Sequence, residues 1–221
     1  MVRLDTNIDP DSMMSLMTNA ISEISADDLA FLFATGKSEL EIRNQIALYM
    51  HRNLHSNYIV TREWRRHDLA VLENGKPKVL VEGKSWIHAD AVNPGKMHSG
   101  KNSIVAGLER DIKKMNSTAG ANPEVNQFIT VALFTVDVQR ASKHRVDEAA
   151  IPYAGTHRRA IAQHENAIEL AGRGRGALSD LLIRYGSVKR APLMEGYFHE
   201  FRVEADFFLL KPTASFISDK L

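Results

Sequence analysis

Two short apolar runs joined by a turn signal lie near the middle of the chain. Residues 69–72 and 79–81 are apolar enough for strands of a sheet covered on both faces, and the intervening ENGKPK predicts a hairpin. Charged residues flank these runs: Asp68 begins the first strand, and Glu82 and Lys84 lie near the end of the second. Because an unpaired charge in a buried strand costs several kcal/mol, these three side chains need partners.

The geometry of this hairpin decides whether the three charges can meet. Side chains at positions i and i+2 of a strand share a face, so Glu82 and Lys84 point the same way. A two-residue Asn-Gly loop would put Asp68 opposite Val81, whereas a loop of three or five residues puts it opposite Glu82. Pro77 cannot donate to the ladder, which favours a place in the loop or at a strand end. We therefore predict an odd-length loop or a bulge; a two-residue hairpin without a bulge would exclude a shared site.

Amphipathic patterns predict helices around the hairpin. Residues 9–12 and 25–28 are start signals for two N-terminal helices, which we expect to pack over the sheet or to form a dimer face. Apolar residues at helical spacing predict another helix over residues 38–54 and a further one over residues 104–115.

Three more segments predict strands. Residues 57–64 are rich in β-branched and aromatic side chains, as expected for a first strand. Residues 128–136, FITVALFTV, are nearly all apolar and predict a buried strand beside the Glu82 strand at the centre of the sheet. Residues 197–210 partly alternate between polar and apolar and predict a closing strand at the sheet edge.

The remaining segments predict loops and helices. Residues 85–101 suggest a long loop that could contact substrate or act as a lid. Helical patterns cover residues 142–150, 158–171 and 178–185. Between the last two, residues 172–176 (GRGRG) indicate either a segment that inserts into a DNA groove or a flexible surface linker.

These elements predict an α/β fold: a central mixed β-sheet of about four to six strands, flanked by helices. We expect a single domain over residues 1–221, with a helical N-terminal extension (1–36), a core (38–136) and a helical region with the closing strand (137–221).

Composition narrows the classes of protein. The chain is 44% hydrophobic and 25% charged, and no apolar run approaches the ~18 residues that span a bilayer, so we expect no membrane association. We see no export signal, and the lack of cysteine excludes disulfides and thiolate metal sites, so we expect a cytoplasmic protein. A net charge of +1 means that nucleic-acid binding would depend on local clusters of cations.

The charged residues of the hairpin suggest metal chemistry. Two carboxylates that converge with a lysine can hold Mg²⁺, and the lysine can orient or deprotonate a water or neutralise charge on a phosphate. Glu39 extends the apolar stripe of its helix backward and so points inward, although it could also simply stabilise the helix N-terminus. Glu41 lies three residues after Ser38, the spacing of a capping box.

Asp68, thirteen intervening residues and then Glu82-Gly83-Lys84 resemble the signature of the PD-(D/E)xK superfamily, the restriction-endonuclease-like nucleases. The resemblance covers roughly residues 38–136, and His67 stands where the family's name has proline. It implies a helix carrying a glutamate, a three-strand meander bearing the motif, a helix, a further strand and variable helices. It also implies a restriction-endonuclease-like core with extra N- and C-terminal helices.

The resemblance further implies a Mg²⁺-dependent (or Mn²⁺-dependent) deoxyribonuclease that hydrolyses phosphodiester bonds by a metal-activated water. Asp68, Glu82 and Glu39 would bind the metal, with Glu41 the second candidate for the helix acid, and Lys84 would position the water. The substrate would be double-stranded DNA. A likeness to the site-specific members implies a homodimer and restriction of foreign DNA, as by a type II restriction endonuclease, whereas repair, recombination or mobile-element biology would fit the same site equally well.

Several cations are candidates for contacts with DNA phosphates. Each could instead be a solvated surface charge. They are Arg62, Arg65, Arg66, Lys101, Lys113, Lys114, Arg173 and Arg175.

Other functions compete with this hypothesis. The fold could serve as a catalytically inactive DNA-binding or protein-interaction module, with Asp68, Glu82 and Lys84 forming only a buried salt-bridge network. An enzyme acting on a small phosphorylated ligand is disfavoured because no GxxxxGK[ST] motif occurs. His51 and His55 have the spacing of a helical zinc site, but their polar neighbours favour a solvated face.

Overall fold

The computed structural model describes residues 8–36, 38–120, 122, 124–139 and 151–213. The strands are β1 (Tyr58–Trp64), β2 (His67–Glu73), β3 (Lys76–Ile87), β4 (Asn126–Val136), β5 (Gly186–Arg190), β6 (Met194–Phe198) and β7 (Phe201–Pro212). The helices are α1 (Pro10–Ser22), α2 (Ala26–Thr35), α3 (Ser38–Asn53), α4 (His88–Val92), α5 (Pro94–His98), α6 (Ile104–Ala119), α7 (Ala154–Ile161) and α8 (Ala167–Ile183).

The described strands form one seven-stranded mixed sheet in the order β1-β2-β3-β4-β7-β5, with β6 also paired to β7. Strands β1, β2 and β3 form an antiparallel meander, and β4 runs parallel to β3. The predicted α/β class and the place of β4 beside the Glu82 strand are thus confirmed, but the sheet is larger than the four to six strands expected.

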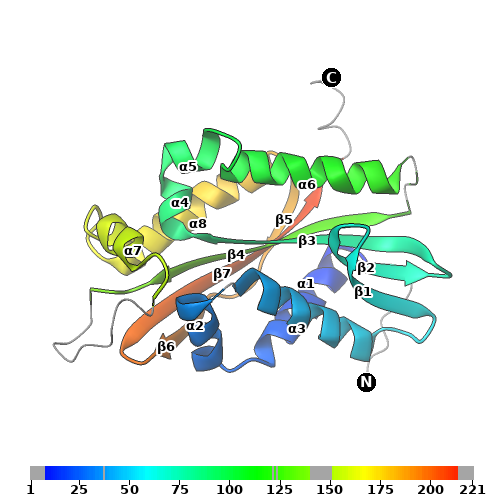
Figure 1. The fold of residues 1–221 in the computed structure, drawn as a ribbon, viewed down its shortest axis with the longest axis horizontal. Coiled ribbons are helices and arrows are strands. Elements are labelled where there is room, and N and C mark those ends of the chain that lie inside the picture. The colour runs from blue at the N-terminus through cyan, green and yellow to red at the C-terminus, as the bar shows by residue number, and fades with distance from the viewer. Residues whose placement is uncertain (1–7, 37, 121, 123, 140–150, 214–221) are drawn as a thin grey trace.

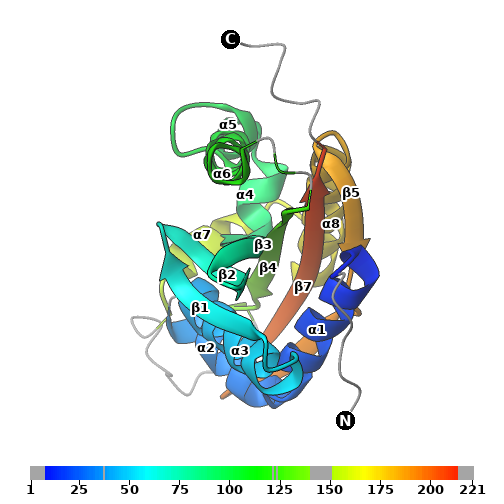
Figure 2. The same ribbon diagram turned by 90° about the vertical axis from the view of Figure 1, so that its right-hand side faces the viewer.

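Helices cover both faces of this sheet (Figure 1). Helices α1, α2 and α3 lie on one face, and α4, α5, α6 and α8 lie on the other, as the end view also shows (Figure 2). The N-terminal helices therefore pack over the sheet, the first of the two roles expected for them. None of the described helices is both long and apolar enough to cross a membrane.

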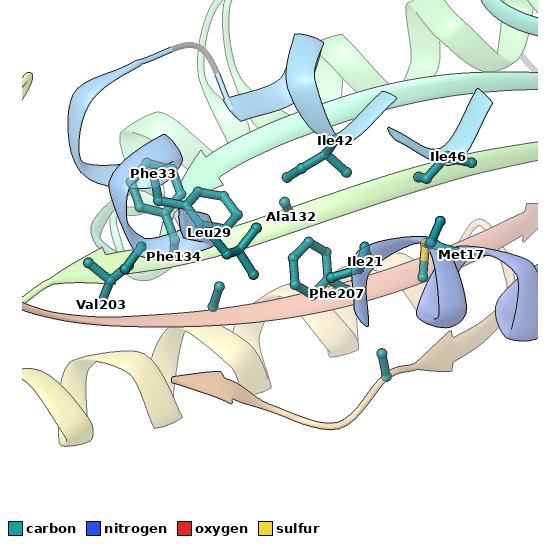
Figure 3. Packing of buried hydrophobic residues seen from close by; sticks show 14 of the residues in the cluster. Met17, Ile21, Leu29, Phe33, Ile42, Ile46, Ala132, Phe134, Val203 and Phe207 are labelled. Carbon is teal, nitrogen blue, oxygen red and sulfur yellow. The ribbon is translucent and has the colours of Figure 1, made fainter. Parts of the chain in front are cut away.

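Two hydrophobic cores result from this layering: one lies under α1 to α3 and also includes residues of α4, α7 and α8, and the other lies mainly under α6 and the second half of α8. The core under α1 to α3 contains Met17, Leu29, Phe33 and Ile46 packed against strand residues such as Phe207 (Figure 3). Alternate residues of β2 and β3 divide between the two cores. Leu69, Val71, Val79 and Val81 face α3, whereas Ala70, Leu72 and Leu80 face α6.

The β2–β3 hairpin combines a two-residue loop with a bulge. Asn74 and Gly75 both have positive φ (51° and 75°), as a tight hairpin turn requires, and Glu73 pairs with Lys76. The register shifts between Val71 and Leu72, so the ladder beyond the bulge pairs Leu69 with Val81. The ladder between β2 and β3 ends at this pair, and His67 rather than Asp68 contacts Glu82. The prediction of an odd-length loop or a bulge is confirmed in its second form.

The sequence signals at helix ends are also borne out. Ser12 donates its backbone N–H to Asp9 Oδ1 at the start of α1, and Asp28 donates to the Ser25 hydroxyl at the start of α2. Gly36 ends α2, as expected.

The segment after β3 was expected to be a long loop, and this expectation is wrong. Strand β3 continues to Ile87, and the short helices α4 and α5 follow directly. Asn93 caps α5 by accepting from the backbone N–H groups of Gly95 and Lys96. The polar residues of this segment thus partly serve to cap short helices.

The C-terminal third differs most from expectation. Residues 142–150 lie outside the described residues. The GRGRG segment is not a linker but the middle of α8, which runs without a break from Ala167 to Ile183. The closing strand is in fact two strands, β6 and β7, and β7 lies between β4 and β5 rather than at the sheet edge.

The close packing of α8 on α4 explains one of its glycines. A Cβ at Gly174 would lie 2.8 Å from His88 Cβ and 2.9 Å from the His88 carbonyl oxygen. No side chain fits there, so a glycine inside the helix is required despite its low helix propensity.

Candidate functional site

Two carboxylates line the edge of β3 that β2 leaves open. Asp68 Oδ2 accepts the backbone N–H of Gly83 at 2.8 Å, and Glu39 Oε2, from α3, accepts that of Ser85 at 3.2 Å. A Cβ on Gly83 would lie 3.6 Å from Glu39 Cγ and 3.7 Å from Asp68 Oδ2. Gly83, the middle residue of the motif, thus leaves room for both acids to approach one point of the strand.

Glu82 points away from this edge, toward α6. It is only 1% exposed, and its carboxylate lies 2.7 Å from His67 Nδ1 and 2.6 Å from Lys114 Nζ. His67 also contacts Thr118 of α6, with 2.7 Å between Nε2 and Oγ1. Glu82 is therefore enclosed by a histidine and a lysine that both contact α6.

Lys84 also faces α6, as its shared strand face with Glu82 requires. Its ammonium group lies 2.7 Å from Asp111 Oδ2, and both side chains are largely buried. Asp111 and Lys114 are three residues apart on α6 and so lie on one side of that helix. The acid and the base of β3 thus lie beside a base and an acid of α6.

Burial shapes the acid–base properties of these groups. Burial raises the pKa of Glu82 to about 8, although its hydrogen bond to Lys114 opposes the shift. Burial also raises the pKa of Glu39, which Lys84 partly offsets. Burial disfavours the charge of Lys84, but the nearby carboxylates of Asp111, Glu39 and Asp68 outweigh it and raise its pKa. Lys84 is therefore a cation at neutral pH.

The donor set suits a hard cation at the open edge of β3. Glu39 and Asp68 offer carboxylate oxygens near one point, and Mg²⁺ is commonly held by one or two carboxylates with waters and phosphate oxygens. The described residues contain no group of three His, Asp or Glu side chains arranged to hold a metal ion. The residues present thus fit a two-carboxylate site, and Glu82, held by Lys114, does not join it in this arrangement.

The structure distinguishes the two candidate helix acids. Glu39 is partly buried against β3, whereas Glu41 is exposed on the outer side of α3. The Ser38 hydroxyl, expected in a capping box with Glu41, instead lies 2.8 Å from the Ser85 hydroxyl. Glu39 is therefore the acid of α3 that reaches the motif.

Two of the three arginines near the motif form the β1–β2 turn, and the third, Arg62, lies within β1. Arg65 and Arg66 both have positive φ (48° and 72°) in a turn where Asn or Gly would be usual, and both are exposed. The Arg65 guanidinium lies 4.7 Å from the centre of the Trp64 ring, and Lys114 donates to the Arg66 carbonyl oxygen. Arg62 donates to Asn44 of α3 at 2.9 Å.

Of the other candidate DNA contacts, some are exposed and others form ion pairs with acidic residues of the protein. Lys101 and Lys113 are exposed, whereas Lys114, expected to point outward, turns in to Glu82. Arg173 pairs with Glu169 on the surface of α8. Arg175 is used within the fold: its guanidinium binds the buried carboxylates of β7. These acids are Glu204 and Asp206.

The paired histidines of α3 lie on a solvated face, as their neighbours indicated. Both His51 and His55 are exposed, and His55 Nδ1 lies 2.6 Å from Asn57 Oδ1.

Three residues around the motif were not singled out from the sequence as partners of its charges. They are His67, Asp111 and Lys114. A signal was present for the two residues of α6, since opposite charges three apart flank its apolar stripe. Nothing in the sequence showed that this flank faces the β3 charges.

Comparison with known proteins gives no assignment. No family model, curated protein or solved structure matches the chain.

Proposed function

We propose that this protein is a divalent-metal-dependent deoxyribonuclease of the restriction-endonuclease-like class, which hydrolyses phosphodiester bonds in DNA. The observation that supports it most is that Asp68 and Glu39 approach one point of β3, at the end of the bulged β2–β3 hairpin. The order α3, antiparallel β1-β2-β3 meander, α6 and parallel β4 agrees with the element order expected for that class.

Each residue has a distinct role in this proposal. Glu39 and Asp68 would hold Mg²⁺ or Mn²⁺ through their carboxylate oxygens, and Lys84 supplies fixed positive charge for the negative charge that builds up on the phosphate. When bound, the metal supplies a Lewis acid that polarises the phosphate and lowers the pKa of a coordinated water. Glu82 would join the site only when its contact with Lys114 is exchanged.

The test is cleavage of supercoiled plasmid and phage DNA in Mg²⁺ or Mn²⁺ by the wild-type chain, Asp68→Asn and Lys84→Met. We expect both variants to lose at least ~100-fold in rate, because each removes a charge that the reaction requires. Discrete fragments would identify a site-specific enzyme, and a smear a nonspecific or structure-directed one.

Glu39→Gln and Glu41→Gln form a matched pair in the same assay. The first removes the acid that contacts β3, and the second removes an exposed acid of the same helix turn. We expect Glu39→Gln to weaken Mn²⁺ binding, measured by electron paramagnetic resonance, and Glu41→Gln to leave it unchanged. Equal Mn²⁺ affinity in all variants, or cleavage that survives Asp68→Asn, would contradict the proposal.

A binding module without catalytic activity is the second candidate. The observation that favours it is that Glu82 and Lys84 are already matched by Lys114 and Asp111 of α6. Binding of duplex DNA without cleavage in any divalent metal would support this alternative. If cleavage is site-specific, we further propose a homodimer acting on a palindromic duplex, which sedimentation with and without DNA would test.

A further inference from the structure

A cleft of about 550 Å³ adjoins the candidate site. It lies among the N-terminal turn of α3, the end of β3, the helices α4 and α5, and the start of α7. Glu39 and Ser85, which are hydrogen-bonded to each other at the open edge of β3, also line the cleft. Its size is in the range typical of small-molecule sites, and it is continuous with the proposed position of the metal.

Aromatic side chains from three elements line this cleft. Trp86 is partly buried at the end of β3, and Phe134 is buried on β4. Tyr153 is 70% exposed and has a φ of 65°, which is rare for a non-glycine residue. An exposed tyrosine in a strained conformation beside a cleft is more readily explained by a ligand than by packing.

Polar groups of both signs accompany the aromatic rings. Asp90 is partly buried, and burial raises the pKa of its carboxyl while Lys96 opposes the shift. Lys96 is exposed at the rim. Arg43 pairs with Glu63 and lies 3.6 Å from Asp68, and its buried Nε has no hydrogen-bond partner among the described residues.

We propose that this cleft binds one unstacked nucleobase of the nucleic-acid substrate, next to the phosphate at the candidate site. The inference rests on the proposed function and adds the form in which the substrate is bound: a strand with one base outside the stack, either single-stranded or flipped from a duplex. Trp86 and Tyr153 supply aromatic surface for the base, and Lys96 and Arg43 supply charge for the flanking phosphates. Asp90 can accept a hydrogen bond from an exocyclic amino group, as acids do from cytosine.

Tryptophan fluorescence tests this inference independently of cleavage. The chain has two tryptophans, so Trp64→Phe leaves Trp86 as the sole tryptophan. We expect a short single-stranded oligodeoxynucleotide, added without divalent metal, to quench Trp86 in a saturable manner, and inorganic phosphate to have no effect. Adding Tyr153→Ala should weaken binding about tenfold, the scale of one lost stacking contact.

Two controls make the test specific for a base. Tyr197→Ala removes a tyrosine of β6 that is also exposed and does not line the cleft, and it should leave the affinity unchanged. An oligonucleotide with an abasic site at each position in turn should bind more weakly at one position, and there Tyr153→Ala should cause no further loss. An equal loss from Tyr153→Ala on intact and abasic strands would overturn the inference.

The outcome also separates this inference from the proposed function. DNA cleavage without any response of Trp86 to bound oligonucleotide would overturn the base site and leave the nuclease intact. Quenching of Trp86 that meets both controls, in a chain that cleaves no DNA, would establish the base site and overturn the nuclease. Quenching by inorganic phosphate alone would assign the cleft to an anion and overturn the base site.

Discussion

At the scale of single residues, Glu82 and Lys114 form a pair in which one partner is buried and the other is not. Glu82 is 1% exposed, whereas the Lys114 side chain is 30% exposed. Loss of the lysine would leave one oxygen of the buried carboxyl without a partner, since His67 contacts only the other oxygen, whereas loss of the acid would leave an ammonium that can reach solvent. The pair is therefore asymmetric in its effect on stability.

Lys114→Met tests this asymmetry. We expect it to lower the free energy of unfolding by about 1–3 kcal/mol, because it leaves a buried carboxyl oxygen without its hydrogen-bond partner. Lys113→Met, at the exposed neighbouring position, should change it by no more than about 0.5 kcal/mol. Urea unfolding of both variants measures the difference, and equal stabilities would show that the pair contributes nothing.

His157 predicts a loss of stability in acid. Its ring is fully buried beside Phe134, and burial, with a smaller contribution from His88, lowers its pKa to about 4. The unfolded chain takes up this proton near pH 6.5, so the stabilisation is complete above about pH 6.5 and is lost as the pH falls toward 4, by roughly 3 kcal/mol in total.

The measurement is the urea midpoint between pH 7.5 and pH 4.5 for the wild type and His157→Gln. We expect the variant to lose less stability over this range, because it has no buried imidazole to protonate. His51→Gln, at an exposed position on α3, should follow the wild type. Parallel curves for the wild type and His157→Gln would exclude His157 as the source.

At the scale of elements, the three alternating glycines of α8 have different surroundings. Gly174 lies against His88 of α4, whereas Gly172 and Gly176 are exposed, and no neighbouring atom lies within 4 Å of a Cβ built on either. The GRGRG segment therefore contains one position where only glycine fits and two positions where an alanine would be tolerated.

Alanine substitution should separate these positions. Gly174→Ala should destabilise the protein by about 1–3 kcal/mol through overpacking against α4. Gly172→Ala and Gly176→Ala should each stabilise it by roughly 0.5–1 kcal/mol, because alanine is the better helix former. Thermal unfolding of the three variants gives the comparison, and destabilisation by all three would indicate that α8 does not extend through this segment.

At the scale of the whole molecule, the sequence predicted the features that depend on local pattern and on the need to compensate charge. Periodicity predicted the α/β class, α3, the strands β1 to β3 and β4. The requirement that Asp68 reach the register of Glu82 predicted the bulge. The place of Glu39 on the apolar stripe of α3 predicted its inward position.

The features that were missed depend on contacts between distant segments. The glycines of α8 resemble a linker until the approach of His88 is known. The helical spacing of α6 places Lys114 on its polar flank, and only the position of α6 over β3 turns that flank toward Glu82. Strand β7 showed alternation, but its pairing partners, β4 and β5, could not be chosen from the sequence.

The central place of β7 has a consequence for how the protein is made. Chains are synthesised from the N-terminus, and β7 comes after every other described strand in the sequence. Until β7 leaves the ribosome, one edge of the apolar strand β4 has no strand to pair with. The two hydrophobic cores also lack Phe207 and Phe208 until then. An unpaired apolar edge is a site of aggregation. The nascent chain therefore carries an open sheet from the completion of β4 until β7 emerges, and a product cut short before residue 201 would keep that edge permanently.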